Sequence, residues 1–107
     1  MIKNNKPYTN ENGWEDKDLL SDLPMDQQHR VLSWIKNRIK LRKTKNFRHS
    51  SYGLKHYLQD EIGIYLTNNQ FKDAMMMCGY YPINPDKLNW NYCISEKSTA
   101  FMRQISR

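Results

Sequence analysis

The chain has 107 residues and a net charge of +6, with 38% hydrophobic and 12% aromatic residues. This length fits one domain with a modest core, and so many aromatic side chains argue against wholesale disorder. Residues 1–24 contain no secretory apolar segment, and no apolar run approaches the ~18 residues of a membrane span. Cys78 and Cys93 form neither a CxxC motif nor a disulfide framework. The sequence therefore predicts a cytoplasmic protein with reduced thiols and no membrane association.

The charges are unevenly distributed along the chain. Residues 1–26 hold six of the eleven acidic residues, and residues 27–59 contain none. That acid-free stretch carries nine Lys and Arg residues. An acidic head and a basic middle predict a polyanionic or acidic partner for the middle segment.

Residues 1–20 are expected to form a flexible acidic N-terminal arm, and residues 21–107 one domain. The segment "MIKNNKPYTNENG" has no period, and Pro7 and Gly13 interrupt it. Trp14, Leu19 and Leu20 are the side chains suited to attach it to the body. Two roles stay open: a disordered tail, or an acidic flap that covers the basic surface when no partner is bound.

A first helix is predicted over residues 25–43. Pro24 suits the first turn of a helix, and Val31, Ile35 and Ile39 recur every four residues. This prediction places Lys40, Arg42 and Lys43 in the last turn, where cations complement the helix dipole. Residues 44–50, "TKNFRHS", have no helical period and are expected to end the helix as a loop.

A second helix is predicted over residues 52–62, with Ser50 or Ser51 as its N-cap. Leu54, Tyr57, Leu58 and Ile62 supply its core face, with Glu61 as the alternative to Ile62, and Gly63 stops it. The next three residues, "IYL", are β-formers and predict a short extended bridge.

A third helix is predicted over residues 68–78, ended by Gly79. Thr67 and Gln70 have the spacing of a capping box. Phe71, Ala74 and Met75, with Cys78, are expected to face the core.

The C-terminal part predicts one strand and a last short helix. Trp90, Tyr92 and Ile94 alternate with polar residues, as in a half-buried β-strand. The only good partner visible in the sequence is "GIYL" at 63–66. Phe101, Met102 and Ile105 suggest a final short helix.

This order of elements predicts a mainly α domain with a small β-ribbon, of helix-turn-helix or winged-helix-like type. In such folds the last helix enters the major groove. Its expected exposed positions are Asn68, Asn69, Gln70, Lys72, Asp73 and Met76. Asn and Gln can bridge adenine edges, while Thr67 and Lys72 would contact phosphates. Simple helix capping by the Asn and Gln side chains is the alternative.

The stretch from Ser50 to Ser95 also resembles a known group of proteins. "SYGLKHYLQDEIGIYLTNNQFKDAMMMCGYYP" and "LNWNYCIS" are similar to small, mostly uncharacterised proteins of Gram-positive phages and other mobile elements. More distantly, "SYGLKHYL", "TNNQFKDAM" and "CGY" resemble the winged-helix segment of phage and plasmid primase-helicases. The resemblance implies a mobile-element origin. No ATPase motif accompanies it, so it implies no helicase or primase activity.

The basic segment over residues 36–48 is the main candidate site. It has seven Lys and Arg residues in thirteen positions, interleaved with apolar ones. The full set of expected nucleic-acid-binding residues is Lys36, Arg38, Lys40, Arg42, Lys43, Lys45, Arg48, Thr67, Asn68, Asn69, Gln70 and Lys72. A solvated surface, or capture of an acidic protein surface, are the alternatives. Aromatic residues of the C-terminal third, Tyr80, Tyr81, Trp90 and Tyr92, are either core or stacking platforms for unpaired bases.

The sequence predicts no enzyme, metal site or cofactor, because no catalytic or phosphate-cradling motif is present. Two functions fit. The first is a non-enzymatic DNA- or RNA-binding protein, a regulator or replication accessory. The second is an inhibitor of a host nucleic-acid enzyme, such as a restriction nuclease or a CRISPR effector, that acts by protein binding. A homodimer is expected if the target has dyad symmetry.

Overall fold

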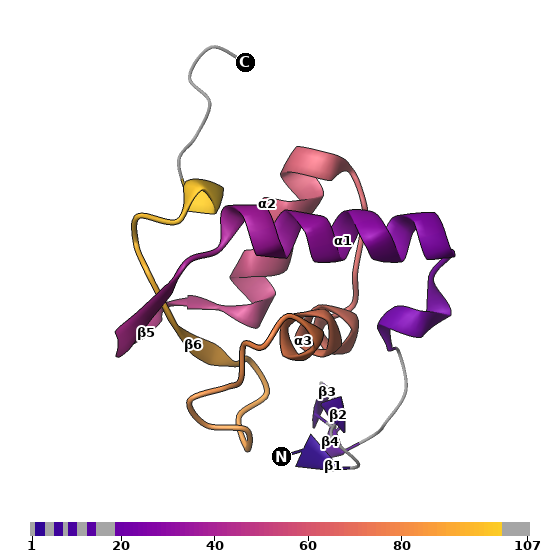
Figure 1. Ribbon diagram of the computed structural model, residues 1–107. Helices are drawn as coiled ribbons and strands as arrows, with labels where there is room; N and C mark the ends of the chain where they lie inside the picture. Colours follow the sequence, from indigo (N-terminus) through magenta and orange to yellow (C-terminus); the bar gives the residue numbers. More distant parts are fainter. Residues whose placement is uncertain (1, 4–5, 8, 11–12, 15–18, 102–107) are drawn as a thin grey trace.

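The structure, a computed structural model, describes residues 19–101 and the backbone of residues 2–3, 6–7, 9–10 and 13–14. Its elements are the strands β1 (Ile2–Lys3), β2 (Lys6–Pro7), β3 (Thr9–Asn10) and β4 (Gly13–Trp14), the 3-10 helix η1 (Leu20–Asp22), the helix α1 (Met25–Arg38), the strand β5 (Leu41–Ser50), the helices α2 (Ser51–Ile62) and α3 (Asn68–Met77), the strand β6 (Asn91–Ile94) and the 3-10 helix η2 (Thr99–Phe101). Figure 1 shows α1 lying across α2 and α3, with β5 and β6 at one side of the helices. The domain is mainly α with small two-stranded antiparallel sheets, β1 with β2, β3 with β4 and β5 with β6, which confirms the coarse prediction.

The three long helices enclose one hydrophobic core. Val31, Ile35 and Ile39 of the predicted stripe are buried, and Trp34 beside them is 4% exposed. Leu54 and Leu58 of α2 pack into the same cluster, as do Phe71, Ala74 and Met75 of α3. The four-residue recurrence in the sequence therefore identified the inward face of α1, and the predicted core residues Leu54, Leu58, Phe71, Ala74 and Met75 are buried in α2 and α3.

Local sequence signals set the ends of α2 and α3 as predicted. The Ser50 hydroxyl accepts from the Gly53 backbone N–H at 3.4 Å, and Gly63 ends α2 with a left-handed φ of 74°. Thr67 and Gln70 form the predicted capping box: Thr67 Oγ1 accepts from the Gln70 N–H, and Gln70 Oε1 from the Thr67 N–H. Each cap satisfies backbone groups that a helix terminus leaves unpaired.

The predicted first helix is too long. α1 ends at Arg38, and residues 41–50 form β5 instead of a helix end and a loop. β5 pairs antiparallel with β6, through Leu41 with Ile94, Asn46 with Tyr92 and Ser50 with Asn91, and the register shifts twice between these pairs. Further backbone bonds, from Ser95 to Lys40 and from Ser51 to Trp90, both 2.7 Å, extend this pairing at each end.

The predicted pairing of the bridge with the C-terminal strand is also wrong. Residues 63–67 belong to no strand, and β6 pairs with β5. Ile64 and Leu66 are buried while Tyr65 is 61% exposed, so the bridge has the alternation of a strand without its hydrogen bonds. Alternation of buried and exposed residues indicates only that one side of a segment faces the core. Which segment pairs with β6 is determined by other parts of the chain.

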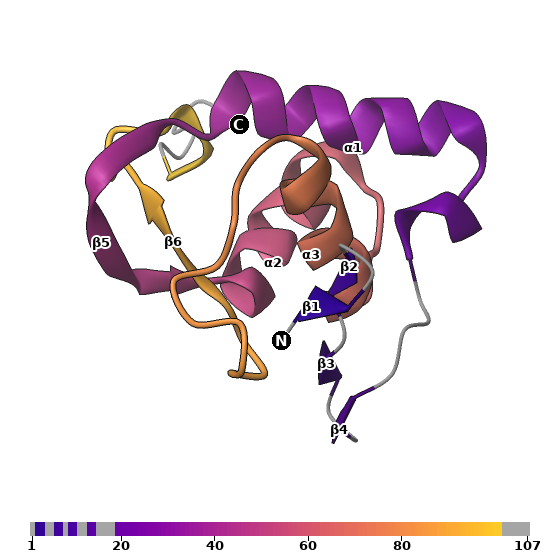
Figure 2. The ribbon, with the colours of Figure 1, turned by 60° about the horizontal axis from the view of Figure 1, so that its bottom comes forward.

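The N-terminal segment meets the body at α3. Leu20 is fully buried, and its backbone N–H donates to the Asp73 carboxylate at 2.9 Å. This confirms Leu20 as an attachment point. The strands β2 and β3 lie against α3, and Figures 1 and 2 show β1 and β2 beside α3 and all four short strands away from β5. Four acidic residues of the proposed flap, Glu11, Glu15, Asp16 and Asp18, lie outside the described residues.

At the C-terminal end the strand prediction is confirmed, since Trp90, Tyr92 and Ile94 are fully buried. Of the predicted last helix, the structure describes the single turn η2, which ends at Phe101. Met102 and Ile105 lie outside the described residues. None of the helices in the described part of the chain is long and apolar enough to cross a membrane.

Two buried tyrosines allow a matched test of this core. The Tyr92 hydroxyl is buried and has no hydrogen-bond partner in the described part of the chain, whereas the Tyr80 hydroxyl donates to the Ile39 carbonyl at 2.8 Å. We expect Tyr92→Phe to raise the free energy of unfolding by about 1 kcal/mol, because it removes an unsatisfied buried group. We expect Tyr80→Phe to lower it by about 1 kcal/mol.

Urea unfolding followed by circular dichroism measures both changes in the full chain. An equal decrease in the free energy of unfolding for Tyr92→Phe and Tyr80→Phe would contradict this description of the core.

Candidate nucleic-acid interface

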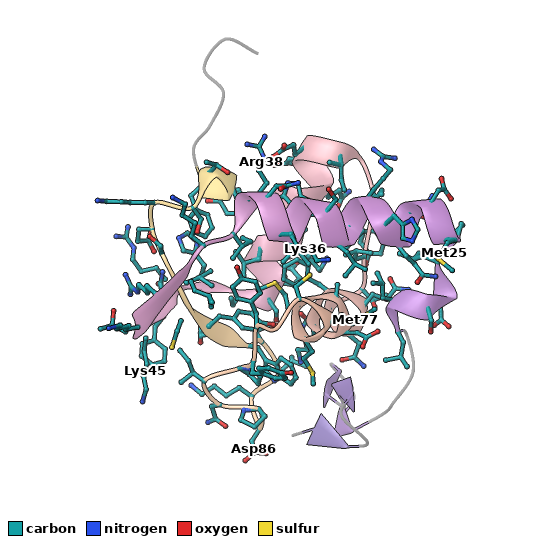
Figure 3. All side chains as sticks on the ribbon, viewed as in Figure 1. Met25, Lys36, Arg38, Lys45, Met77 and Asp86 are labelled. Carbon is teal, nitrogen blue, oxygen red and sulfur yellow. The ribbon has the colours of Figure 1, made fainter. Side chains whose placement is uncertain are left out.

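The strand β5 and the residue before its start present an exposed row of cations. Lys40, Lys43, Lys45 and Arg48 are all exposed, and we call these four residues the β5 cationic strip. An extended chain advances about 3.3 Å per residue, against 1.5 Å in a helix, so the strand spreads the charges over a longer track than the predicted helix would. Figure 3 shows Lys45 at the outer end of the molecule, on β5.

Two large apolar side chains are exposed on the same strand. Leu41 is 67% exposed and Phe47 is 65% exposed. Apolar groups among cations are suited to contact bases or an apolar patch on a partner, while the cations contact its anionic groups.

Two of the predicted arginines are engaged within the protein. Arg38 forms an ion pair with Glu61 through Nη2, and its Nε donates to the same carboxylate oxygen at 2.9 Å. The pair lines a cleft of about 390 Å³ beside Trp34, whose indole N–H also binds Glu61. Arg42 is half-buried, and its guanidinium donates to the carbonyls of Thr44 and Lys45. Arg38 is therefore neutralised and Arg42 helps to shape β5.

Lys36 lies apart from the strip. It is exposed on α1 and close enough to Cys78, at the end of α3, to affect its thiol. Burial raises the pKa of the Cys78 thiol, and the Lys36 charge lowers it in part. Figure 3 shows Lys36 between α1 and α3, with Arg38 on the far side of α1. The seven predicted cations therefore do not form one continuous strip.

The fold brings a carboxylate to the strip that the local sequence lacks. Asn46 is 1% exposed, and its amide donates to the Ile94 carbonyl at 3.0 Å and to the Glu96 carboxylate at 2.6 Å. His49 lies 3.1 Å from the other Glu96 oxygen. These hydrogen bonds from Asn46 and His49, aided by the nearby Arg48 charge, hold the pKa of Glu96 below its usual range. The expectation of a surface without nearby acids is wrong at this end of β5.

The predicted groove-reading surface of α3 is buried. Asn69 is 2%, Gln70 9% and Lys72 0% exposed, and Asp73 and Met76 are buried as well. Lys72 lies over the Trp90 ring, with Nζ 4.7 Å from its centroid, and burial lowers its pKa to about 8. The expected exposure of these five residues is therefore wrong, because β2 and β3 lie against α3 and the protein body packs around it.

Thr67 and Asn68 are half-exposed, yet both are used within the fold. The Thr67 hydroxyl caps α3. The Asn68 carbonyl oxygen accepts from the Ser51 hydroxyl at 2.7 Å, and its amide nitrogen donates to Asn89 at 2.8 Å. These contacts favour the capping alternative over base recognition.

A group of exposed aromatic residues was not predicted. Tyr52 is 53% and Tyr65 61% exposed, and both rings lie beside Lys55. In the sequence, Tyr52 precedes the apolar period of α2 and Tyr65 lies in the bridge, so neither belongs to a core pattern. Large aromatic residues outside any core pattern were the signal in the sequence that could have identified both tyrosines as exposed. Of the predicted aromatic set, Tyr80, Trp90 and Tyr92 are buried and Tyr81 is exposed.

Comparisons of the chain with protein-family models, curated proteins and solved structures found no match. The resemblance to phage and mobile-element proteins therefore stays a prediction. In the described part of the chain, no three His, Cys, Asp or Glu side chains gather as a metal site would require.

The strip depends on Asn46, which gives a first test. We expect Asn46→Ala to lower the free energy of unfolding by about 2 kcal/mol, because the Ile94 carbonyl and the Glu96 carboxylate lose their donor. Thr44→Ala, at an exposed position of the same strand, is the matched control and should change it by less than about 0.5 kcal/mol. Urea unfolding measures both, and equal effects would show that Asn46 does not anchor β5.

Proposed function

We propose that this protein binds nucleic acid without catalysis, as a regulator or replication accessory of a phage or mobile element. The β5 cationic strip would contact the phosphates. One observation carries the proposal: in residues 19–101, none of these four cations has a carboxylate within the 4.0 Å of an ion pair. Cations held on a strand without such partners are available to release counterions from a polyanion.

The proposed fold type is a reduced winged helix. The order α1, β5, α2, α3, β6 sets a β-ribbon beside a helix pair, and β-ribbons are among the elements that contact DNA. The groove contact first expected of α3 is not part of this proposal, since Asn69, Gln70 and Lys72 are buried. The ribbon replaces that helix as the element that approaches the nucleic acid.

A charge-matched pair of variants tests the strip. Lys43→Gln/Lys45→Gln removes two charges from the strip, and Arg30→Gln/Lys87→Gln removes two from α1 and the loop before β6. We expect the strip variant to weaken binding to a labelled DNA and to reduce the slope of log affinity against log salt by about 2, because each phosphate contact contributes about 0.9. Fluorescence anisotropy titrations at salt concentrations from about 50 to about 200 mM measure both the affinity for DNA and the salt slope.

The control variant should keep a salt slope closer to that of the unchanged protein. Equal losses in the two variants would indicate binding through net charge alone. Failure of the unchanged protein to bind any DNA or RNA at low salt would overturn the proposed function.

A second candidate, inhibition of a host nuclease or CRISPR effector, is favoured by the exposed Leu41 and Phe47 and by the edge of β5. Among the described strands, β5 pairs only with β6. An open edge with apolar side chains can accept a strand from another protein, or from a second copy to form a homodimer.

Affinity capture from a bacterial lysate separates the two candidates. If the protein acts on nucleic acid, nuclease treatment of the lysate should abolish recovery of co-purified host proteins. One host nuclease retained in stoichiometric amount after that treatment, and lost with Leu41→Ser/Phe47→Ser, would favour the inhibitor instead. Tyr81→Ser, at another exposed aromatic position, is the control for surface change.

A further inference from the structure

Tyr52, Lys55 and Tyr65 form a compact group where α2 begins. The Lys55 ammonium lies 5.0 Å from the centroid of the Tyr52 ring and 4.7 Å from that of Tyr65. His56 packs edge-on against Tyr52, with ring centroids 4.8 Å apart and an interplanar angle of 77°. Tyr52 is therefore held by two neighbours on its own helix, although its ring is exposed.

In this group the lysine is buried and the aromatic rings are exposed, whereas lysine is usually the more exposed residue type. Lys55 is only 4% exposed, while the two tyrosines beside it are more than half exposed. In the described part of the chain, no carboxylate pairs with Lys55. Burial lowers the pKa of Lys55. The Lys55 ammonium lies against two ring faces, and a positive charge in this setting attracts an approaching anion.

The group also lies next to the β5 cationic strip along the chain. β5 ends at Ser50 and Tyr52 is in the first turn of α2. Arg48, the last residue of the strip, is four residues before Tyr52, so their Cα atoms are at most about 14 Å apart. A single strand that contacts both residues would have to span no more than a few nucleotides.

We propose that Tyr52 and Tyr65 stack on unpaired bases and that Lys55 attracts the adjoining phosphate, so that the preferred ligand is single-stranded nucleic acid. This inference rests on the proposed function and specifies its substrate class. Exposed tyrosine rings beside positive charge are the means by which proteins bind single strands without sequence preference. In a duplex the base faces are stacked on one another and closed to such rings.

The alternative occupant is a protein surface, which also favours exposed tyrosine. Charge argues for the nucleic acid. Residues 27–59, which include the strip, Tyr52 and Lys55, contain no acidic residue of their own, and the Glu96 carboxylate that the fold brings to the Arg48 end is bound by Asn46 and His49. A phosphate backbone supplies anions at regular spacing along the whole track.

The experiment measures the binding of two labelled ligands to the full chain, an oligo(dT) of about 20 nucleotides and a duplex of equal length. This length is sufficient, since the larger single-strand sites cover about 16 nucleotides. We expect Tyr52→Ala/Tyr65→Ala to weaken oligo(dT) binding at least about fivefold per ring, and duplex binding by less than about twofold. Tyr52→Phe/Tyr65→Phe keeps the rings and should bind like the unchanged protein. Tyr81→Ala removes an exposed ring elsewhere and is the matched control.

Circular dichroism and thermal unfolding establish that each variant is folded, and the Phe variant keeps the test valid if the Ala variant is unstable. Equal losses on both ligands, or none on oligo(dT), would overturn the inference while leaving the proposed function intact. A protein that binds duplex but not oligo(dT) would overturn it as well. A protein that binds neither ligand would overturn both.

Discussion

The buried amide of Asn46 is the contact on which the candidate surface depends. β5 is a ten-residue strand in which four side chains are Lys or Arg, and it pairs with a strand of only four residues. Between the two register shifts, the Asn46 amide reaches across to the Ile94 carbonyl and the Glu96 carboxylate. Because hydrogen bonds to a charged group in a partly buried site are strong, this side chain reinforces the backbone pairing with β6 that holds β5 extended.

What the sequence predicted correctly is local. The four-residue recurrence identified the inner face of α1, and Ser50, Gly63 and the Thr67–Gln70 pair marked ends of α2 and α3. These features depend on residues within one or two turns of each other, so a single chain segment contains all the information. The alternation around Tyr92 is local in the same sense, and β6 was predicted for that reason.

What the sequence did not reveal requires partners that are distant along the chain. Nothing within "LRKTKNFRHS" alternates, and this segment is extended because β6, about fifty residues later, pairs with it. The burial of α3 has the same origin. Lys72 and Asp73 have the composition of an exposed helix face, yet Trp90 covers the first and the backbone of Leu20 binds the second. Composition predicts the exposure of a polar side chain only where no other part of the fold packs against it.

The fold, and not the net charge of +6, determines which cations a partner can meet. Arg38 is neutralised by Glu61, Arg42 binds its own strand, and Lys72 is buried against an indole ring. The four residues of the β5 cationic strip are left exposed, three of them on β5 and Lys40 directly before it, and Lys55 is buried near the end of that strand between two exposed rings. Exposed lysines attract any phosphate backbone at long range, whereas exposed rings discriminate at contact, because only an unpaired base offers its face. The affinity for nucleic acid would therefore come from the β5 cationic strip, and the preference for single strands from the exposed tyrosine rings. Substitutions can remove either group without the other.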